Sequence, residues 1–257
     1  LITILILYIL VVSFSYFLQY LNLSHLKRFG NIIPPEFERE IDEELLNRSR
    51  DYTVGNIQFG FFSSIFHNIV VLVFLFGGIL NIYNSWIVSI NLSFIPSGLV
   101  FFLLLLYADT ILTIPFSLYT VFKIEKKFGF CTMTPGLWAA DLLKSLLVST
   151  ILVAIVISTG LFLIQKSPDF WWLWVWGFFL IFSIFIMYIS PYVIEPLFNK
   201  FTPIDDETLE EGIRSLMEKA GIMVSRVFKM DASKRTKHTN AYFTGIGRVK
   251  RIVLYDT

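Results

Sequence analysis

Four long stretches without a charged side chain constrain this sequence more than any other feature. No Asp, Glu, Lys or Arg occurs in residues 1–26, 52–108, 145–165 or 170–194. A helix needs roughly 20 apolar residues to cross the hydrocarbon core of a bilayer, and each stretch reaches that length. Only 16% of all residues are charged, whereas soluble domains usually carry about a quarter. The sequence therefore predicts an α-helical multi-pass membrane bundle.

Polar residues divide the longest of these stretches, which is too long for one crossing. The break lies between residues 81 and 96, and five spans result, near residues 1–22, 59–80, 97–120, 143–164 and 170–190. Four tryptophans at the start of the fifth span favour the headgroup boundary (Trp171, Trp172, Trp174 and Trp176). The first span begins at Leu1 without a basic segment before it, so we expect a retained helix in a chain truncated at its start.

Basic residues in the loops predict the orientation. The loop at 23–58 holds five Lys or Arg residues and the loop at 121–142 holds three, whereas the loop at 81–96 holds none. Basic loops stay on the cytoplasmic side, so we expect the N-terminus outside and everything after about residue 195 in the cytoplasm. The membrane is expected to be a bacterial cytoplasmic membrane or the endoplasmic reticulum.

Residues 199–257 have the pattern of a soluble domain, so we expect a membrane domain at 1–198 followed by the start of an α+β domain. Acidic residues at 205–207 predict a helix start and Gly221 predicts its end. Its apolar face consists of Leu209, Ile213, Leu216, Met217 and Ala220. Strands are expected at 226–230, 240–244 and 250–255, with a hairpin turn at 245–247. We expect this domain to be truncated at Thr257.

Polar side chains inside the predicted spans leave two interpretations open. Asp109 lies in the third span, and His67 and Asn68 lie in the second. Groups of this kind face a partner or a water-filled cavity, because lipid cannot solvate them. Either they relay protons or ions, as in a transporter or a lipid-handling protein with a hydrated cavity, or they hydrogen-bond between helices. Pro115 in the third span predicts a kink.

Three stretches resemble one family. They run from Ile114 to Phe130, from Pro191 to Pro203, and from Asp231 to Gly245 with a continuation at 250–257. There the sequence resembles the CAAX prenyl protease 1 type of M48 metallopeptidases, which are integral-membrane zinc proteases. The resemblance implies helices that enclose a hydrated chamber, and a metalloendopeptidase that cuts prenylated CAAX-type or related membrane peptides near their C-terminus. No nucleic-acid partner is expected.

The zinc-binding motif of that family, His-Glu-x-x-His, is absent from the sequence. The three histidines, His25, His67 and His238, lie far apart and none is followed by Glu. In the family the two His of the motif and a distant Glu hold zinc, and the Glu of the motif acts on the metal-bound water. We therefore expect the catalytic residues and zinc ligands to lie C-terminal to Thr257 and this fragment alone to be inactive. A non-catalytic membrane scaffold is the alternative that the missing motif suggests.

The resemblance does imply one substrate-binding segment within the chain, Asn240-Ala241-Tyr242. In the family, such a strand borders the cleft and the substrate pairs with it as an added strand. The backbone of Ala241 would hold the peptide, and the Asn240 side chain would bond its main chain. The pattern also fits an ordinary edge strand whose aromatic residues pack on the core. Tyr242 and Phe243 point to opposite faces, so at most one of them faces substrate.

A basic run and a lone cysteine complete the candidate residues. The basic run consists of Lys234, Arg235, Lys237 and His238. Either it attracts anionic headgroups or a substrate carboxylate, or it is a solvated loop balanced by nearby acids. The single cysteine, Cys131, excludes an intrachain disulfide framework and is interpreted as a small apolar filler.

Overall fold

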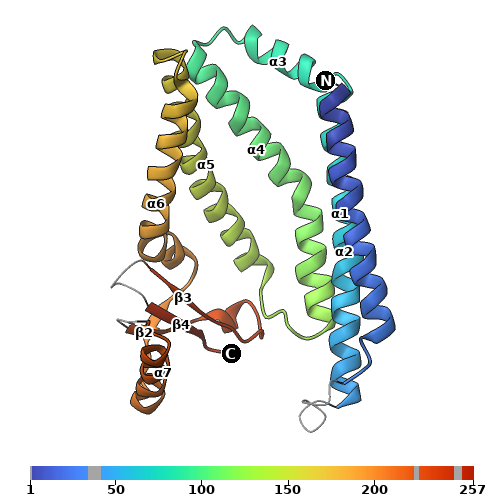
Figure 1. Cartoon of the computed structure of the whole chain (residues 1–257), viewed down its shortest axis with the longest axis vertical. Helices are drawn as coiled ribbons and strands as arrows, with labels where there is room; N and C mark the ends of the chain where they lie inside the picture. The colour runs from blue at the N-terminus through green and yellow to red at the C-terminus, as the bar shows by residue number, and fades with distance from the viewer. Residues whose placement is uncertain (1, 34–41, 223–225, 246–250) are drawn as a thin grey trace. The chain divides into compact units, whose positions relative to one another are not determined.

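A computed structural model of the chain describes residues 2–33, 42–222, 226–245 and 251–257 (Figure 1). Five of its helices are long and apolar enough to cross a membrane, which confirms the predicted bundle and the predicted number of spans. The membrane-length helices are α1 (Ile2–Phe29), α2 (Glu43–Phe76), α4 (Phe94–Tyr119) with its π-helical extension η2 (Thr120–Glu125), α5 (Pro135–Lys166) and α6 (Trp171–Phe198).

These helices are longer than the spans expected from charge-free residues alone. The structure begins α2 at Glu43 rather than near residue 59, and α5 at Pro135 rather than near residue 143. Thr134 caps α5 by accepting a hydrogen bond from the backbone N–H of Leu137 at 3.2 Å. Charged residues are expensive only inside the apolar layer, so a helix can continue past it through residues that a search for apolar segments excludes.

Most of the predicted polar break is helical. The helix α2 ends at Phe76, before Gly77 and Gly78, and Gly78 has a φ of 85° that favours glycine. A short helix, α3 (Ile79–Ser89), follows and contains Asn81 and Asn84. Its Ile87 is only 2% exposed. The polar residues of this segment thus occupy part of a helix surface instead of a loop.

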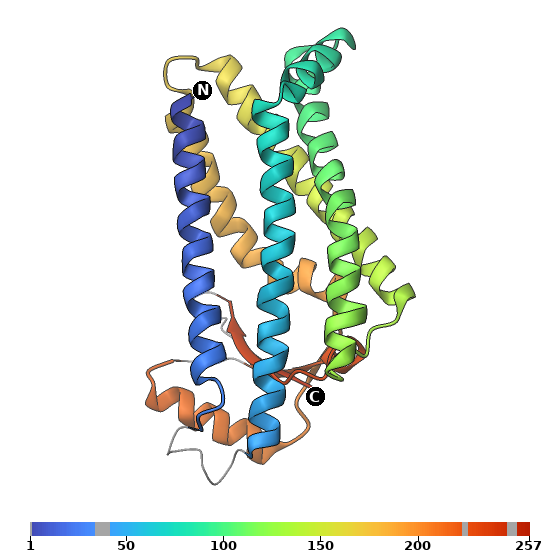
Figure 2. The ribbon, with the colours of Figure 1, turned by 90° about the vertical axis from the view of Figure 1, so that its right-hand side faces the viewer.

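Contacts divide the chain into two compact units, Leu1–Ser89 with Thr110–Gly129 and Ile90–Asp109 with Phe130–Thr257. In the first unit α1 and α2 lie side by side (Figure 2). The Tyr8 hydroxyl donates to Asn68 Oδ1 at 2.5 Å, and Asn68 Nδ2 donates to the Tyr16 hydroxyl at 2.9 Å. His67 Nε2 lies 3.3 Å from Thr113 Oγ1. For these two residues the structure supports hydrogen bonding between helices.

The helix α4 is continuous across Pro115, and its hydrogen-bond pattern changes to that of a π-helix only at Thr120. Rings from α2 surround the neighbouring Phe116, with centroid distances of 6.0 Å to Phe59, 6.2 Å to Phe62 and 5.0 Å to Phe66. Ring contacts of this kind stabilise the helix pair where a proline removes a backbone donor.

The second unit contains α5, α6 and a four-stranded sheet. The strands are β1 (Phe201–Pro203), β2 (Arg226–Met230), β3 (Ala241–Thr244) and β4 (Arg251–Tyr255), in the order β1-β2-β4-β3. The predicted hairpin is present as the antiparallel pair β3–β4, and Gly245 after β3 has a φ of 101°. Positions 246 and 247 of the predicted turn lie outside the described residues. The strand β1 and the parallel pair β2–β4 were not predicted.

The sheet has a small apolar core. Val253 at its centre is fully buried, and Met230 and Ala232 lie against it. Aromatic side chains surround these three (Phe201, Phe228, Tyr242 and Tyr255). The predicted helix at the start of this region is α7 (Glu207–Lys219), which Asp206 caps and which Gly221 follows at a φ of 72°. On its predicted apolar face Ile213 and Met217 are half-buried, whereas Leu209 and Leu216 are exposed.

Candidate functional site

The predicted substrate-binding strand lies at an edge of the sheet. The strand β3 pairs with β4, and no described strand pairs with its other side. The N–H of Tyr255 donates to the carbonyl of Asn240 at 2.9 Å, which makes Asn240 and Tyr255 a hydrogen-bonded pair. Such pairs alternate along an antiparallel ladder, so the N–H and C=O groups of Ala241 and Phe243 point away from β4. The open edge therefore offers backbone donors and acceptors to an extended peptide.

The Asn240 side chain bonds to this edge itself. Its Oδ1 accepts a hydrogen bond from the backbone N–H of Ala241 at 2.9 Å, and the side chain is exposed. An amide group that bonds its own neighbour covers an N–H that would otherwise face solvent. Asn240 and Ala241 thus lie together at the open edge and are already joined by one hydrogen bond.

The Tyr242 side chain points the other way, into the sheet. It is half-buried against the core, and its hydroxyl donates to Glu195 Oε2 at 3.1 Å. Burial raises the pKa of Tyr242 well above its ordinary value, and the negative charge of Glu195 adds to the effect. Phe243, on the opposite face, is 61% exposed. Of the two aromatic residues, Phe243 has the free side chain.

A buried charge network, which the sequence analysis missed, holds β4 to α6. Arg251 Nη2 donates to Glu195 Oε2 at 3.1 Å and to the Pro191 carbonyl at 2.6 Å. Its guanidinium also lies 5.0 Å from the ring centroid of Phe201 and 5.5 Å from that of Phe228. The sequence carried one signal for it, since Glu195 is the first charge after the uncharged stretch at 170–194.

The basic run is not one solvated cluster. Arg235 forms a bidentate pair with Asp141, at 2.7 and 2.9 Å, and also donates to Asn199 Oδ1 and to the Phe198 carbonyl. Lys234 pairs with Asp231 at 2.7 Å, which fits the interpretation of balancing acids. The His238 ring stacks on Phe130 with centroids 4.0 Å apart. Arg235 therefore fastens the loop before β3 to α5 and to the end of α6.

No described part of the chain offers a metal site. In residues 2–33, 42–222, 226–245 and 251–257, no three His, Cys, Asp or Glu side chains gather as ligands. His25 lies beside Phe29, both ring nitrogens of His67 have hydrogen-bond partners, and His238 is stacked. Cys131 Sγ contacts the Met133 carbonyl at 3.8 Å. These residues do not fit a zinc ion.

Comparison with known proteins decides the family. The family model for the CAAX prenyl protease N-terminal region with five membrane helices matches residues 22–200, and the model for peptidase family M48 matches residues 203–257. The chain belongs to the CAAX prenyl protease 1 type of M48 peptidases. The earlier resemblance is confirmed, and the peptidases of this family depend on zinc.

Individual relatives agree with this CAAX prenyl protease assignment. CAAX prenyl protease 1 of Saccharomyces cerevisiae is 35% identical over 257 residues, covering 95% of this chain and 55% of that protein. The human CAAX prenyl protease 1 homolog is 34% identical over 232 residues, covering 88% and 49%. The crystal structure of S. mikatae Ste24p matches with a TM-score of 0.87 at 34% identity, covering 97% of this chain and 60% of that one. The chain spans about half the length of these curated relatives.

Proposed function

We propose that this chain forms the membrane part and the substrate-binding strand of a zinc metalloendopeptidase. In this proposal the enzyme cuts prenylated CAAX-type or related membrane peptides near their C-terminus. The open edge of β3 carries the proposal, because the backbone groups of Ala241 and Phe243 point away from β4. The names of the yeast and human relatives support the substrate class. The five membrane-length helices fit an enzyme whose substrates are membrane peptides.

The proposal includes a division of labour along the sequence. Residues 1–198 form the membrane domain, and residues 199–257 begin a protease domain that faces the cytoplasm. In this proposal zinc is bound by residues C-terminal to Thr257, as the resemblance to the M48 family implies. By itself this chain should bind peptide weakly and hydrolyse nothing.

Peptide binding at β3 would exchange one hydrogen bond for two. A backbone carbonyl of the incoming strand would accept a hydrogen bond from the N–H of Ala241. This bond would replace the 2.9 Å hydrogen bond from the same N–H to Asn240 Oδ1. The released amide then bonds the main chain of the peptide beside it. Tyr242 takes no direct part, since its hydroxyl is held by Glu195, but it fixes the strand against the sheet core.

The test uses two variants of the full-length protein. Asn240→Ala removes the side-chain bond to the peptide and should lower kcat/KM by up to about tenfold, since one neutral hydrogen bond contributes roughly 0.5–1.5 kcal/mol. Ala241→Pro removes the outward N–H without breaking the pairing with β4, and should abolish cleavage while the protein stays folded. Zinc content should be unchanged in both variants. Cleavage of a farnesylated CAAX peptide is the readout.

Thr239→Ala is the matched control, because Thr239 is an exposed neighbour outside β3. If Asn240→Ala and Ala241→Pro both cleave the peptide with normal kinetics, β3 is an ordinary edge strand without a role in substrate binding. A separate arm adds phenanthroline to the unmodified enzyme. If the chelator leaves cleavage untouched, the zinc mechanism is wrong whatever the strand variants do.

The cytoplasmic placement has its own test. A single cysteine at position 131, in the basic loop, should react with a membrane-impermeant maleimide only after the cytoplasmic side is opened. A single cysteine at position 93, in the loop before α4, should react from the outside. The reverse labelling pattern would invert the orientation.

A further inference from the structure

The short helix α3 (Ile79–Ser89) has no role in the proposed proteolysis. It follows α2 after the turn at Gly77 and Gly78, and Figure 1 shows it running across the end of α2 rather than along it. It carries no charged side chain, because the charge-free stretch that begins at residue 52 continues to residue 108. Its eleven residues make about three turns, so each side of the helix is represented by several residues.

One side of α3 packs against the protein. Ile87 is 2% exposed, and Leu80 and Tyr83 are half-buried. Successive residues of a helix are about 100° apart, so these three side chains lie within roughly 60° of one another. The Tyr83 ring lies 6.0 Å from the ring of Phe74 in the last turn of α2, measured between centroids. This contact fixes which side of α3 faces α2.

A second side of α3 is apolar and exposed. Ile79 is 44% exposed, Ile82 72% and Trp86 52%. These three side chains also lie within roughly 60° of one another, directly beside the packed side. Large apolar side chains that recur along one side of a helix are costly to leave in water. The stripe therefore indicates contact with an apolar environment.

The third side of α3 is polar but uncharged. Asn81, Asn84 and Ser85 lie there, and all three are exposed. Val88 is the apolar exception on this side, near the end of the helix. Around its axis α3 thus has a side packed on the protein, an apolar side and a polar side. Apolar and polar sides of this kind suit a helix that lies between acyl chains and water.

The length of α2 places α3 at a boundary of the apolar layer. The charge-free part of α2, residues 52–76, spans roughly 37 Å at about 1.5 Å per residue, more than the hydrocarbon thickness of about 30 Å. A helix that enters the layer near Tyr52 has therefore crossed it by Phe76. The helix α3 begins three residues later, at the boundary opposite the basic loop at 23–58. Trp86 fits this depth, since indole rings favour the headgroup region.

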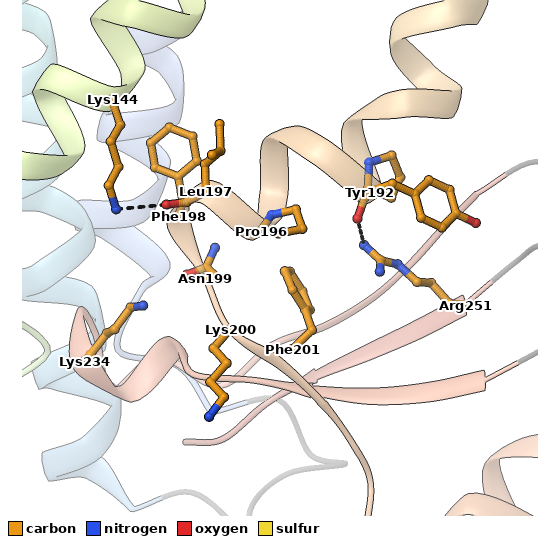
Figure 3. A pocket seen from close by; sticks show the side chains of 11 residues that line it. Lys144, Tyr192, Pro196, Leu197, Phe198, Asn199, Lys200, Phe201, Lys234 and Arg251 are labelled. Atoms are coloured by element: carbon orange, nitrogen blue, oxygen red, sulfur yellow. Dashed lines mark hydrogen bonds between the residues drawn. The ribbon is translucent and has the colours of Figure 1, made fainter.

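Neither charge nor a second copy of the chain accounts for the exposed stripe. The last turn of α6 is a contrasting case, with Lys144, Lys200 and Lys234 around it (Figure 3). The helix α3 has no such cation to attract anionic headgroups. A stable interface between two copies takes about 20–30 residues from each partner, whereas the stripe offers three side chains. Acyl chains are the apolar environment that continues from α2.

We propose that α3 is an interfacial anchor in the leaflet away from the basic loops. Ile79, Ile82 and Trp86 extend into the acyl chains, and Asn81 and Asn84 face water. Because α3 joins directly to α2, it holds that end of α2 at a fixed depth and limits its tilt. The proposal concerns lipid contact alone, so it holds or fails independently of the proposed proteolysis.

Spin labelling of the full-length protein in phosphatidylcholine bilayers tests the anchor. A nitroxide is attached to Ile82→Cys or to its matched control, Asn84→Cys, in a background without other cysteines. The two positions lie about 160° apart around the helix. Molecular oxygen concentrates among acyl chains, whereas a nickel chelate stays in water. The label at 82 should collide mainly with oxygen, at a depth of roughly 5–10 Å, and the label at 84 mainly with the chelate.

A second pair keeps the test independent of one substitution. Trp86→Cys and Asn81→Cys lie about 140° apart and should repeat the reversal of the two collision rates. They replace the first pair if either of its variants fails to fold. The collision rates do not depend on cleavage, so a protein without protease activity would still give this pattern.

Three results would overturn the proposal. If the labels on both sides collide mainly with the nickel chelate, α3 lies in water. If both sides are shielded from both reagents, protein covers the stripe, from a second copy or from another part of the full-length chain. If the label at 82 enters the acyl chains only when phosphatidylglycerol replaces part of the phosphatidylcholine, charge rather than apolar contact holds the helix.

Discussion

The membrane-length helices and the sheet are built from opposite kinds of contact. None of the described residues of α1, α2, α4 or α5 is buried within the chain, and the hydrogen bonds that join α1 to α2 inside their charge-free stretches link the uncharged side chains of Asn68, Tyr8 and Tyr16. The sheet has a fully buried valine and two charged networks with little exposed surface. Lipid replaces buried protein contacts around the helices, whereas the sheet must build its own core and fasten itself with charges.

The largest expected effect tests the charged attachment of the sheet. Arg251→Met leaves the carboxylate of Glu195 without its cation and should lower the free energy of unfolding by about 3–5 kcal/mol. The cost is large because the two side chains are only 11% (Arg251) and 24% (Glu195) exposed, so water compensates the remaining charge poorly. Lys229→Met, on the other face of β2, should cost far less. Hydrogen exchange of β2, β3 and β4 in the full-length protein is the measurement. Equal protection in both variants would show that the core alone holds the sheet.

The next effect separates geometry from charge. Arg235→Lys keeps a positive charge beside Asp141 but loses the bidentate contact and the bonds to Asn199 and Phe198, and should cost about 1.5–3 kcal/mol. Protease sensitivity of the segment from residue 231 to 240 reports the loss. Lys237→Gln, exposed in the same loop, is the control. If Arg235→Lys behaves like this control, charge rather than geometry holds the loop.

A smaller effect is expected between the helices. Asn68→Leu removes the bonds to Tyr8 and Tyr16, and such bonds in membranes contribute about 0.6 kcal/mol on average and about 1.7 at most. A double-mutant cycle with Tyr16→Phe in detergent isolates the coupling. A coupling as large as the cost of Arg251→Met would remove the contrast between the two regions.

The smallest effect concerns acid stability. Burial tends to raise the pKa of Asp256, but hydrogen bonds from the Ser233 hydroxyl and backbone N–H outweigh it and lower that pKa below its ordinary value of 3.8. The stabilisation is therefore complete at neutral pH and is lost as the pH falls below 3.8 through the folded value. Asp256→Asn should flatten this part of the dependence of melting temperature on pH. Asp205→Asn, exposed, should not.

How far the sequence predicts this protein differs between the regions for the same physical reason. Charge-free length is a local property, so the five spans, α7 and the β3–β4 hairpin could be read from neighbouring residues. The bonds from Arg235 to Asp141 and from Arg251 to Glu195 join residues 94 and 56 positions apart, and no local pattern encodes them. The strand β1 is three residues long and depends on its pairing with β2, so it too was missed.

The candidate site, like the fold, could be predicted from the sequence only in part. The motif Asn240-Ala241-Tyr242 was located from the sequence, but the direction of each group was not. The register with β4 turns the Ala241 backbone outward, and the bond to Glu195 turns the Tyr242 side chain inward. Neither follows from the motif itself, because both depend on strands and helices elsewhere in the second unit.

The Asn240 bond to Ala241 also bears on the solubility of the protein. An exposed strand edge can recruit any extended chain and so start aggregation, and proteins blunt such edges by making them short or by occupying their donors. The strand β3 has four residues, and one of its outward N–H groups is already taken by Asn240 Oδ1. A chain that pairs here must first displace that amide, which disfavours chance pairing between two copies of this chain.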